Sequence, residues 1–141
     1  VIAIACGIVE GKGMGQNAKA AVMTRGMAEI KRLGIIKGAA AESFLGLSGI
    51  GDLTLSCNSM TSRNYSLGRA LGEGQKLNDI LAARRTVAEG VTTAKAVAAA
   101  AHRLNVEMPI CLAVNQILHH AAGVDDIVKE LLARHLKFEN F

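Results

Sequence analysis

The sequence contains very few aromatic side chains. Of its 141 residues, one is tyrosine, three are phenylalanine and none is tryptophan, so aromatic residues make up only 3% of the chain. The core must therefore be built from alanine, leucine, isoleucine and valine, and these small side chains favour close packing of helices. No aromatic residues lie among the basic ones, which argues against a groove in which nucleic-acid bases stack.

Cysteine is also scarce. The chain has three cysteines, Cys6, Cys57 and Cys111. An odd number of cysteines, spaced roughly 50 residues apart, fits neither a disulfide framework nor a zinc site. We therefore expect reduced thiols and a cytoplasmic protein.

Long apolar runs are absent. The chain opens on an apolar run at residues 1–9, which is much shorter than the roughly 20 residues that a membrane-spanning helix requires. No basic segment stands before this run, so it is not typical of a secretory signal. We expect a soluble protein without membrane insertion. The apolar start at Val1 in place of Met suggests a cut within a longer protein.

The residues that are present predict one compact domain over residues 1–141. Half of them are hydrophobic and 20% are charged, which excludes disorder. Sixteen Lys and Arg against twelve Asp and Glu give a net charge of +4. This balance is compatible with nucleic acid, a membrane surface or a small anionic substrate. The positive residues are scattered singly or in pairs, which favours the small anion.

Hydrophobic periodicity predicts an all-α domain. Asn17 is expected to cap a long helix that Gly34 ends, Asn78 to cap a short one, and Pro109 to stand where another begins. Residues 1–5 fit a buried strand or a helix equally well, and residues 53–64 are predicted to be mostly loop. The predicted helical segments are residues 18–33, 41–47, 65–71, 78–83, 92–104, 110–122 and 127–133.

Two glycine patterns resemble catalytic or cofactor-binding motifs, but both have the wrong spacing. Residues 11–15 carry three glycines at alternate positions, yet Gln16 stands where a dinucleotide-binding fingerprint needs its last glycine. Ser48 lies between glycines, but Ile50 occupies the position of the second glycine of a nucleophile elbow. Both segments are predicted to be turns.

The histidines do not predict a metal site. His102, His119, His120 and His135 lack the spacing of a helical metal pair, and the adjacent pair points to different faces of a helix. We expect surface or helix-end histidines, and no metal.

One polar segment has the composition of an anion site. Asp52 and the triplet Ser62, Arg63 and Asn64 bring an acid, a hydroxyl, a guanidinium and an amide to a polar stretch that runs into a helix. Such a set suits a phosphorylated polyol, because the guanidinium fork matches phosphate oxygens and the helix start adds N–H donors. A solvated loop with Ser62 as an ordinary N-cap explains the same residues, and the spacing leaves both interpretations open.

Longer motifs carry a resemblance to a known family. The stretches VIAIACGIVEGKGMGQNAKAAVMTRGMAEI, FLGLSGIGDLTLSC, SRN and VAEGVTTAKAV follow one another along nearly the whole chain. In order and spacing they resemble the C-terminal domain of bacterial NAD(P)-dependent glycerol-3-phosphate dehydrogenase. The resemblance implies an all-α, multi-helix substrate domain like the C-terminal domain of 6-phosphogluconate dehydrogenase-like enzymes, with residues 1–9 helical. It also implies an N-terminal Rossmann domain that this chain lacks.

The resemblance implies a reaction. The family reduces dihydroxyacetone phosphate to sn-glycerol 3-phosphate, which feeds glycerophospholipid synthesis, by hydride transfer from NADH or NADPH. The cofactor is expected to bind mainly to the missing domain. The general acid is a lysine of a Lys-Asn pair expected just before Val1, so this chain holds no catalytic lysine of that motif and is expected to be inactive alone.

The resemblance also assigns roles to residues of this chain. Asp52 is expected beside the lysine and the substrate hydroxyls, and the triplet Ser62, Arg63 and Asn64 is expected to hold the substrate. The residues expected to contact the cofactor are Arg63, Val87 and Glu89. A homodimer is also possible.

Arg84 and Arg85 lie outside the family motifs and are predicted to be surface charge. Two other classes of protein are compatible with the composition: a basic helical nucleic-acid-binding module and a ligand-free helical oligomerisation domain.

Overall fold

The computed structural model describes residues 1–134 of the chain, and every regular element in that range is a helix or a helical turn. The all-α prediction is therefore confirmed. The elements are α1 (Ile2–Gly11), α2 (Gln16–Ile36), the turns η1 (Ala41–Phe44) and η2 (Leu47–Gly51), α3 (Asp52–Cys57), α4 (Arg63–Gly72), α5 (Leu77–Ala82), α6 (Gly90–Leu104), α7 (Pro109–His119) and α8 (Val124–Ala133).

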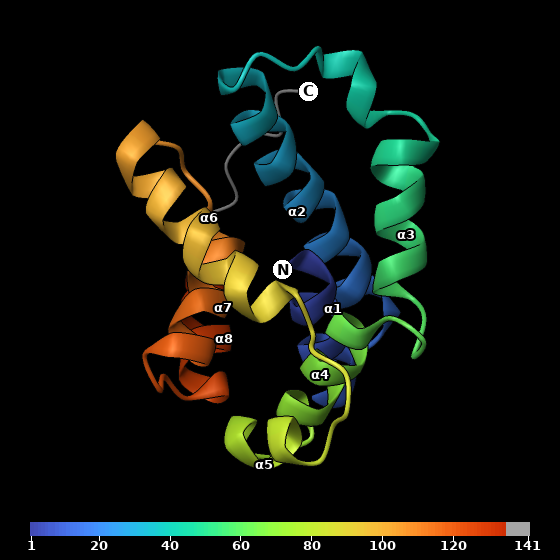
Figure 1. The fold of residues 1–141 in the computed structure, drawn as a ribbon, viewed down its shortest axis with the longest axis vertical. Helices are drawn as coiled ribbons and strands as arrows, with labels where there is room; N and C mark the ends of the chain where they lie inside the picture. Colours follow the sequence, from blue (N-terminus) through green and yellow to red (C-terminus); the bar gives the residue numbers. More distant parts are fainter. Residues whose placement is uncertain (135–141) are drawn as a thin grey trace.

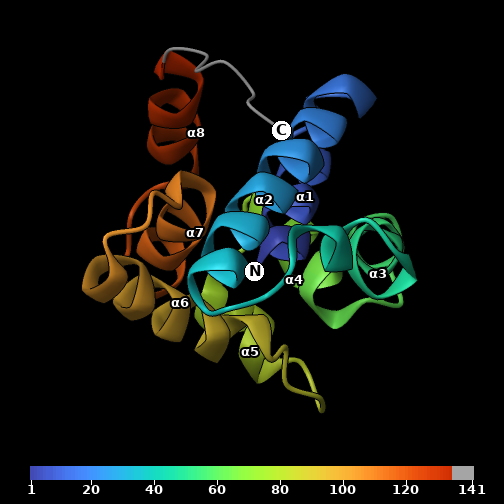
Figure 2. The same ribbon diagram turned by 90° about the horizontal axis from the view of Figure 1, so that it is seen from above.

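Helix α1 forms the centre of the domain. Its residues 2–9 are all buried, which explains why the run is apolar on every face instead of alternating. Figures 1 and 2 show α6, α7 and α8 on one side of α1 and α2, and α3 on the other side. The run is helical, as the family resemblance implied.

Glycines allow α1 and α4 to cross with their backbones in contact. A Cβ atom placed on Gly68 would overlap the backbone carbonyl of Ile4, and one placed on Gly7 would overlap the carbonyl of Tyr65. One turn further along, Gly11 and Gly72 face the opposite helix in the same way. Only a residue without a side chain fits such a close approach. The crossing fixes α4, which begins with two of the candidate site residues.

The predicted start and end of α2 are wrong. Gly15, with φ of 93°, stands at the N-cap position, and Asn17 lies inside the helix. Gly34 also lies inside the helix, because it makes room for the ring of Phe44 instead of reversing the chain. The left-handed glycine after the helix is Gly38, with φ of 95°.

The prediction that residues 53–64 are mostly loop is also wrong, because α3 lies there. Its polar side chains bond to the backbone of their own segment: the Thr54 hydroxyl donates to the Ile50 carbonyl at 2.7 Å, and the Asn58 amide donates to the Thr54 carbonyl at 2.8 Å. Polar composition therefore indicated a loop where a solvent-facing helix lies. Similarly, Lys76, not Asn78, holds the N-cap position of α5.

The second half of the chain follows the predicted pattern more closely. Asn105 ends α6 in the left-handed conformation, with φ of 52°, and Pro109 begins α7 as predicted. Helix α7 ends at His119, three residues earlier than predicted. No helix within residues 1–134 is both long enough and apolar enough to cross a membrane. His135 lies outside the described residues.

Candidate functional site

The start of α4 presents the triplet that the sequence singled out. Ser62 is the N-cap, and its hydroxyl oxygen accepts a hydrogen bond from the backbone N–H of Tyr65 at 3.2 Å. The predicted capping role is confirmed, and it leaves the Ser62 hydroxyl proton free to donate. Arg63 and Asn64 follow as the first two helical residues. Arg63 therefore lies in the first turn of α4, at the end of the helix where backbone N–H groups lack helical partners and the dipole is positive.

The Asn64 side chain joins the starts of α4 and α6. Its Oδ1 atom accepts the backbone N–H of Gly90 at 2.9 Å, and a Cβ atom on Gly90 would overlap that oxygen. Glycine at position 90 leaves room for the amide oxygen to approach the backbone this closely. The SRN and VAEG motifs, which lie 26 residues apart, are thus held in direct contact.

Arg63 and Glu89 meet on the surface beside this contact. The Nη2 atom of Arg63 lies 3.5 Å from Oε1 of Glu89, and the two side chains are 51% and 79% exposed. A single long contact at this exposure contributes little to stability, so the guanidinium can exchange it for another anion. Val87, which is 68% exposed, lies two residues before Glu89. The structure therefore brings Arg63 and Glu89 together on an exposed surface, and Val87 is exposed in the adjoining segment.

Arg84, predicted to be surface charge, contacts the start of α4 through its side chain. Its Nη1 atom donates to the backbone carbonyl of Arg63 at 3.2 Å, and its Nη2 atom donates to the hydroxyl of Ser66 at 2.9 Å. Arg84 is partly buried, while the adjacent Arg85 is exposed. Arg84 is thus a partly exposed charge whose side chain is bonded to α4, and these contacts go beyond the prediction. No local pattern could have found it, because its contacts depend on how α5 returns the chain to α4.

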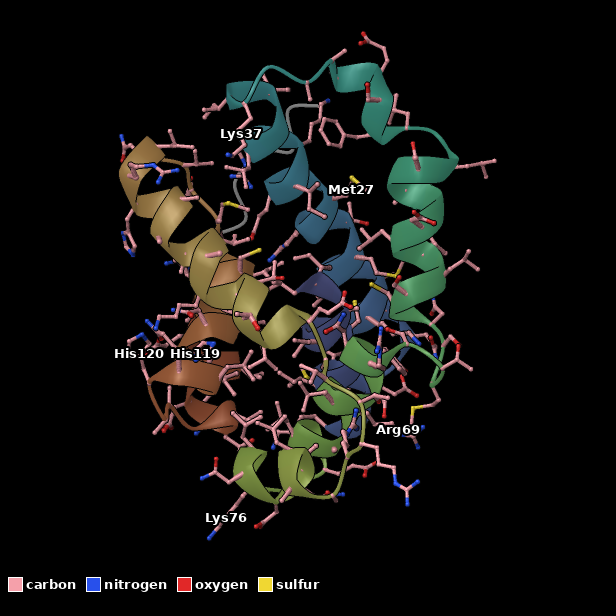
Figure 3. The ribbon with its side chains drawn as sticks, viewed as in Figure 1. Met27, Lys37, Arg69, Lys76, His119 and His120 are labelled. Carbon is pink, nitrogen blue, oxygen red and sulfur yellow. The ribbon has the colours of Figure 1, made fainter. Side chains whose placement is uncertain are left out.

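Asp52 lies in a separate hollow between α2 and α3. The hollow has a volume of about 440 Å³, and its polar side chains are Asp52, Ser48 and Ser56. The apolar lining includes Met27, which lies between α2 and α3 in Figure 3. Ser56 follows Asp52 by one helical turn, so both face the hollow. Had residues 53–64 been predicted as helix, that spacing would have identified Ser56.

The structure does not join Asp52 to the triplet. Within residues 1–134, no hydrogen bond or ion pair links Asp52 to Ser62, Arg63, Asn64 or Glu89. The polar composition predicts one polar loop for these residues, but α3 begins at Asp52 and separates it from the start of α4. The candidate site therefore has two parts, the α2–α3 hollow with Asp52 and the α4 surface with Arg63.

The other candidate motifs have structural roles. The glycines of residues 11–15 lie where α1 turns into α2, as predicted, and Ser48 lies in the helical turn η2. His119 and the backbone carbonyl of Val91 lie 2.6 Å apart. His119 is the last residue of α7 and His120 follows it as the C-cap, and both are labelled in Figure 3. In the described part of the chain, no three His, Cys, Asp or Glu residues are grouped as metal ligands.

Comparison with known proteins gives a consistent result. A family model described as the C-terminus of NAD-dependent glycerol-3-phosphate dehydrogenase matches residues 1–129. Proteins from Rhodospirillum rubrum and Parvibaculum lavamentivorans are both named glycerol-3-phosphate dehydrogenase [NAD(P)+]. Each is 55% identical to this chain over 139 residues, which is 99% of its length. The chain covers 40% of the first and 42% of the second, so it spans less than half of their length.

Solved structures show the same relationship. A glycerol-3-phosphate dehydrogenase from Coxiella burnetii superposes with a TM-score of 0.90 at 41% identity, over 94% of this chain and 41% of that chain. The corresponding enzyme of Saccharomyces cerevisiae superposes with a TM-score of 0.78 at 26% identity, over 94% of this chain and 39% of that chain. The helical arrangement described above is therefore the one these enzymes contain.

Proposed function

The chain belongs to the family of C-terminal domains of NAD-dependent glycerol-3-phosphate dehydrogenase, and on that premise we propose that it is the substrate-binding part of such an enzyme. The whole enzyme would interconvert dihydroxyacetone phosphate and sn-glycerol 3-phosphate with NAD(P)H. The cofactor, NAD or NADP, would be held mainly by a preceding domain and supplies the hydride. The product would feed glycerophospholipid synthesis, and the three buried, free thiols are compatible with a reducing cytoplasm.

The observation that carries this proposal is the position of Arg63. Its guanidinium projects from the start of a ten-residue helix, where unpaired backbone N–H groups favour anions, and it is half exposed. Its single contact to Glu89, at 3.5 Å, leaves other N–H donors free. A phosphate group can accept two parallel hydrogen bonds from such a fork. This corner of the domain therefore suits the phosphate of a three-carbon substrate.

The neighbouring residues support binding in different ways. The free hydroxyl proton of Ser62 can donate to a phosphate or a substrate oxygen, because its oxygen already accepts the N–H of Tyr65. Asn64 holds the Gly90 backbone and so fixes the segment that carries Val87 and Glu89. These two exposed residues would form the edge that meets the cofactor, with Glu89 accepting a hydrogen bond from its amide or ribose side.

Asp52 would act on the reacting end of the substrate. The backbone nitrogen of Val1 lies near the thiols of Cys111, Cys57 and Cys6. Because Cys57 is the last residue of α3, a lysine preceding Val1 in a longer protein would emerge beside the helix that Asp52 begins. A carboxylate there can orient the lysine ammonium, which donates its proton to the carbonyl oxygen as the hydride arrives.

The test joins this chain to the preceding domain of the same enzyme and measures NADH and NADPH oxidation with dihydroxyacetone phosphate. We expect turnover that depends on this substrate, and none from residues 1–141 alone, because hydride transfer needs the nicotinamide held against the substrate by a second domain. Absence of turnover by the joined enzyme, or turnover by the chain alone, would refute the proposal. Oligonucleotide binding that falls steeply with salt would instead support a nucleic-acid module.

A further inference from the structure

We propose that Arg84 is a positioning residue for the phosphate-binding arginine, Arg63. This inference rests on the proposed function and deepens it, since it assigns substrate affinity to a residue outside the family motifs. Arg84 would not touch the substrate. It would set the direction in which Arg63 presents its guanidinium and would hold the neighbouring cofactor-facing segment in place.

The contacts of Arg84 support this role. One guanidinium nitrogen donates to the backbone carbonyl of Arg63 at 3.2 Å, and another donates to the hydroxyl of Ser66 at 2.9 Å. Ser66 lies one turn after Arg63 on α4, so the two hydrogen bonds contact the first turn of the helix at two positions. The planar fork of arginine is suited to such a two-point contact, and the ammonium group of lysine is not.

The same two bonds fix the segment that connects α5 to α6. That segment runs from Ala83 to Glu89 and contains Val87. At its start Arg84 is bonded to α4, and at its end the Gly90 N–H is bonded to Asn64 of α4. Both ends of the segment are therefore attached to the helix that presents Arg63. Without the Arg84 side chain, the hydrogen bonds that join this segment to α4 within residues 1–134 would be those at its Glu89 end.

The charge of Arg84 acts in the same direction. Both of its hydrogen-bond acceptors are neutral, a carbonyl and a hydroxyl, and in the described part of the chain no carboxylate forms an ion pair with the guanidinium. It adds a positive charge behind Arg63 at the positive end of the α4 dipole. A phosphate dianion at Arg63 gains from that field, while the weak Glu89 contact can be released.

The experiment compares arginine variants in the enzyme that joins this chain to its preceding domain. Arg84→Ala should raise the KM for dihydroxyacetone phosphate about tenfold and change kcat less than about threefold, because misplacement weakens binding before it affects chemistry. Arg84→Lys keeps the charge but not the fork and should recover part of the loss. The matched control is Arg85→Ala, an adjacent exposed arginine whose substitution should leave KM unchanged.

A double variant separates positioning from a general loss of structure. If Arg84 acts through Arg63, adding Arg84→Ala to Arg63→Ala should raise KM no further. A lower kcat and melting temperature with an unchanged KM would overturn the inference, because that pattern indicates partial unfolding. Full additivity in the double variant would overturn it as well. If the wild-type joined enzyme has no turnover, the proposed function itself fails. If the wild-type enzyme is active but the Arg84 variants have the same KM as Arg85→Ala, the inference about Arg84 fails and the proposed function stands.

Discussion

Glu29 of α2 illustrates what a single side chain contributes to this fold. It is 1% exposed, and its carboxylate accepts the backbone N–H groups of Ile110 and Cys111 at 2.7 and 3.0 Å. These are two of the unpaired donors at the start of α7. A glutamate 81 residues earlier in the chain therefore caps that helix and fixes α7 against α2.

Removal of this carboxylate should destabilise the domain. Glu29→Ala leaves the Ile110 and Cys111 N–H groups buried without acceptors, so we expect the free energy of unfolding to fall by about 2 to 4 kcal/mol. Urea unfolding followed by circular dichroism measures it. The exposed Glu42→Ala is the control and should change stability by less than about 0.5 kcal/mol. Equal effects of the two substitutions would exclude a capping role for Glu29.

The pH dependence of stability tests the same carboxylate. Burial raises the pKa of Glu29 above its usual value near 4.5, although the N–H groups of Ile110 and Cys111 oppose this shift. The folded state therefore binds more protons than the unfolded state above pH 4.5, and stability falls as the pH rises towards the folded pKa. Glu29→Gln cannot titrate. The wild type should lose stability relative to this variant as the pH rises above 4.5, and a gain would contradict the assignment.

Asp52 gives a catalytic prediction at the residue scale. In the joined enzyme, Asp52→Asn should lower kcat more than it raises KM, because the amide keeps the shape but cannot hold a neighbouring ammonium. Loss of a nearby negative charge lowers the pKa of a cationic acid, so the basic limb of the kcat/KM profile for reduction should move to lower pH. Circular dichroism confirms the fold. If the variant has the kcat of the wild type and the basic limb does not move, Asp52 has no catalytic role and serves only at the start of α3.

At the scale of elements, the crossing of α1 and α4 determines where the site lies. Gly68→Ala places a methyl group against the Ile4 backbone, which cannot move as a flexible side chain can. We expect a loss of at least about 2 kcal/mol in the free energy of unfolding. Gly51→Ala is the matched control, because its Cβ meets only Leu47 and the Gly46 carbonyl at 3.5 Å or more, and it should be neutral or slightly stabilising. Similar melting temperatures for both variants would contradict the close crossing.

The elements also show where sequence reasoning succeeds. Periodic apolar residues predicted the long helices, and Ser62 and Pro109 were correctly placed at helix starts because capping chemistry is local. Helix α3 was missed because its polar side chains bond to its own backbone and resemble a loop in composition. The role of Gly34 was predicted wrongly because the sequence does not distinguish a glycine that leaves room for the Phe44 ring from a glycine that ends a helix.

The candidate site was predictable only in part for a related reason. The triplet at Ser62 and the residues of VAEG were identified, but their direct contact through Asn64 and Gly90 depends on the packing of α4 and α6. Arg84 was dismissed because its partners lie 18 and 21 residues earlier in the chain. Long-range contacts of this kind follow from the tertiary fold, and no local spacing encodes them.

At the scale of the whole molecule, the segment of η1, η2 and α3 carries the three most exposed large apolar side chains of residues 1–134. Leu45, Leu47 and Leu55 are 72%, 89% and 72% exposed. Exposed apolar surface of this kind drives association. We expect the 141-residue chain to self-associate through this face, and Leu47→Asp to shift it towards monomer in sedimentation experiments. The control is Leu132→Asp on α8, where the side chain is 69% exposed. An equal shift towards monomer in both variants would show that association does not depend on the surface around Leu47.

The most direct test of the account is the kcat/KM of Arg63 variants for dihydroxyacetone phosphate in the joined enzyme. Loss of a charge-assisted contact to a desolvated phosphate costs on the order of 2 to 4 kcal/mol, so Arg63→Ala should lower kcat/KM roughly 30-fold to 1,000-fold, mainly through KM. Arg63→Lys should recover only part, because it lacks the fork, and Arg85→Ala should leave kcat/KM unchanged. An unchanged KM for Arg63→Ala would show that the start of α4 does not bind the substrate phosphate.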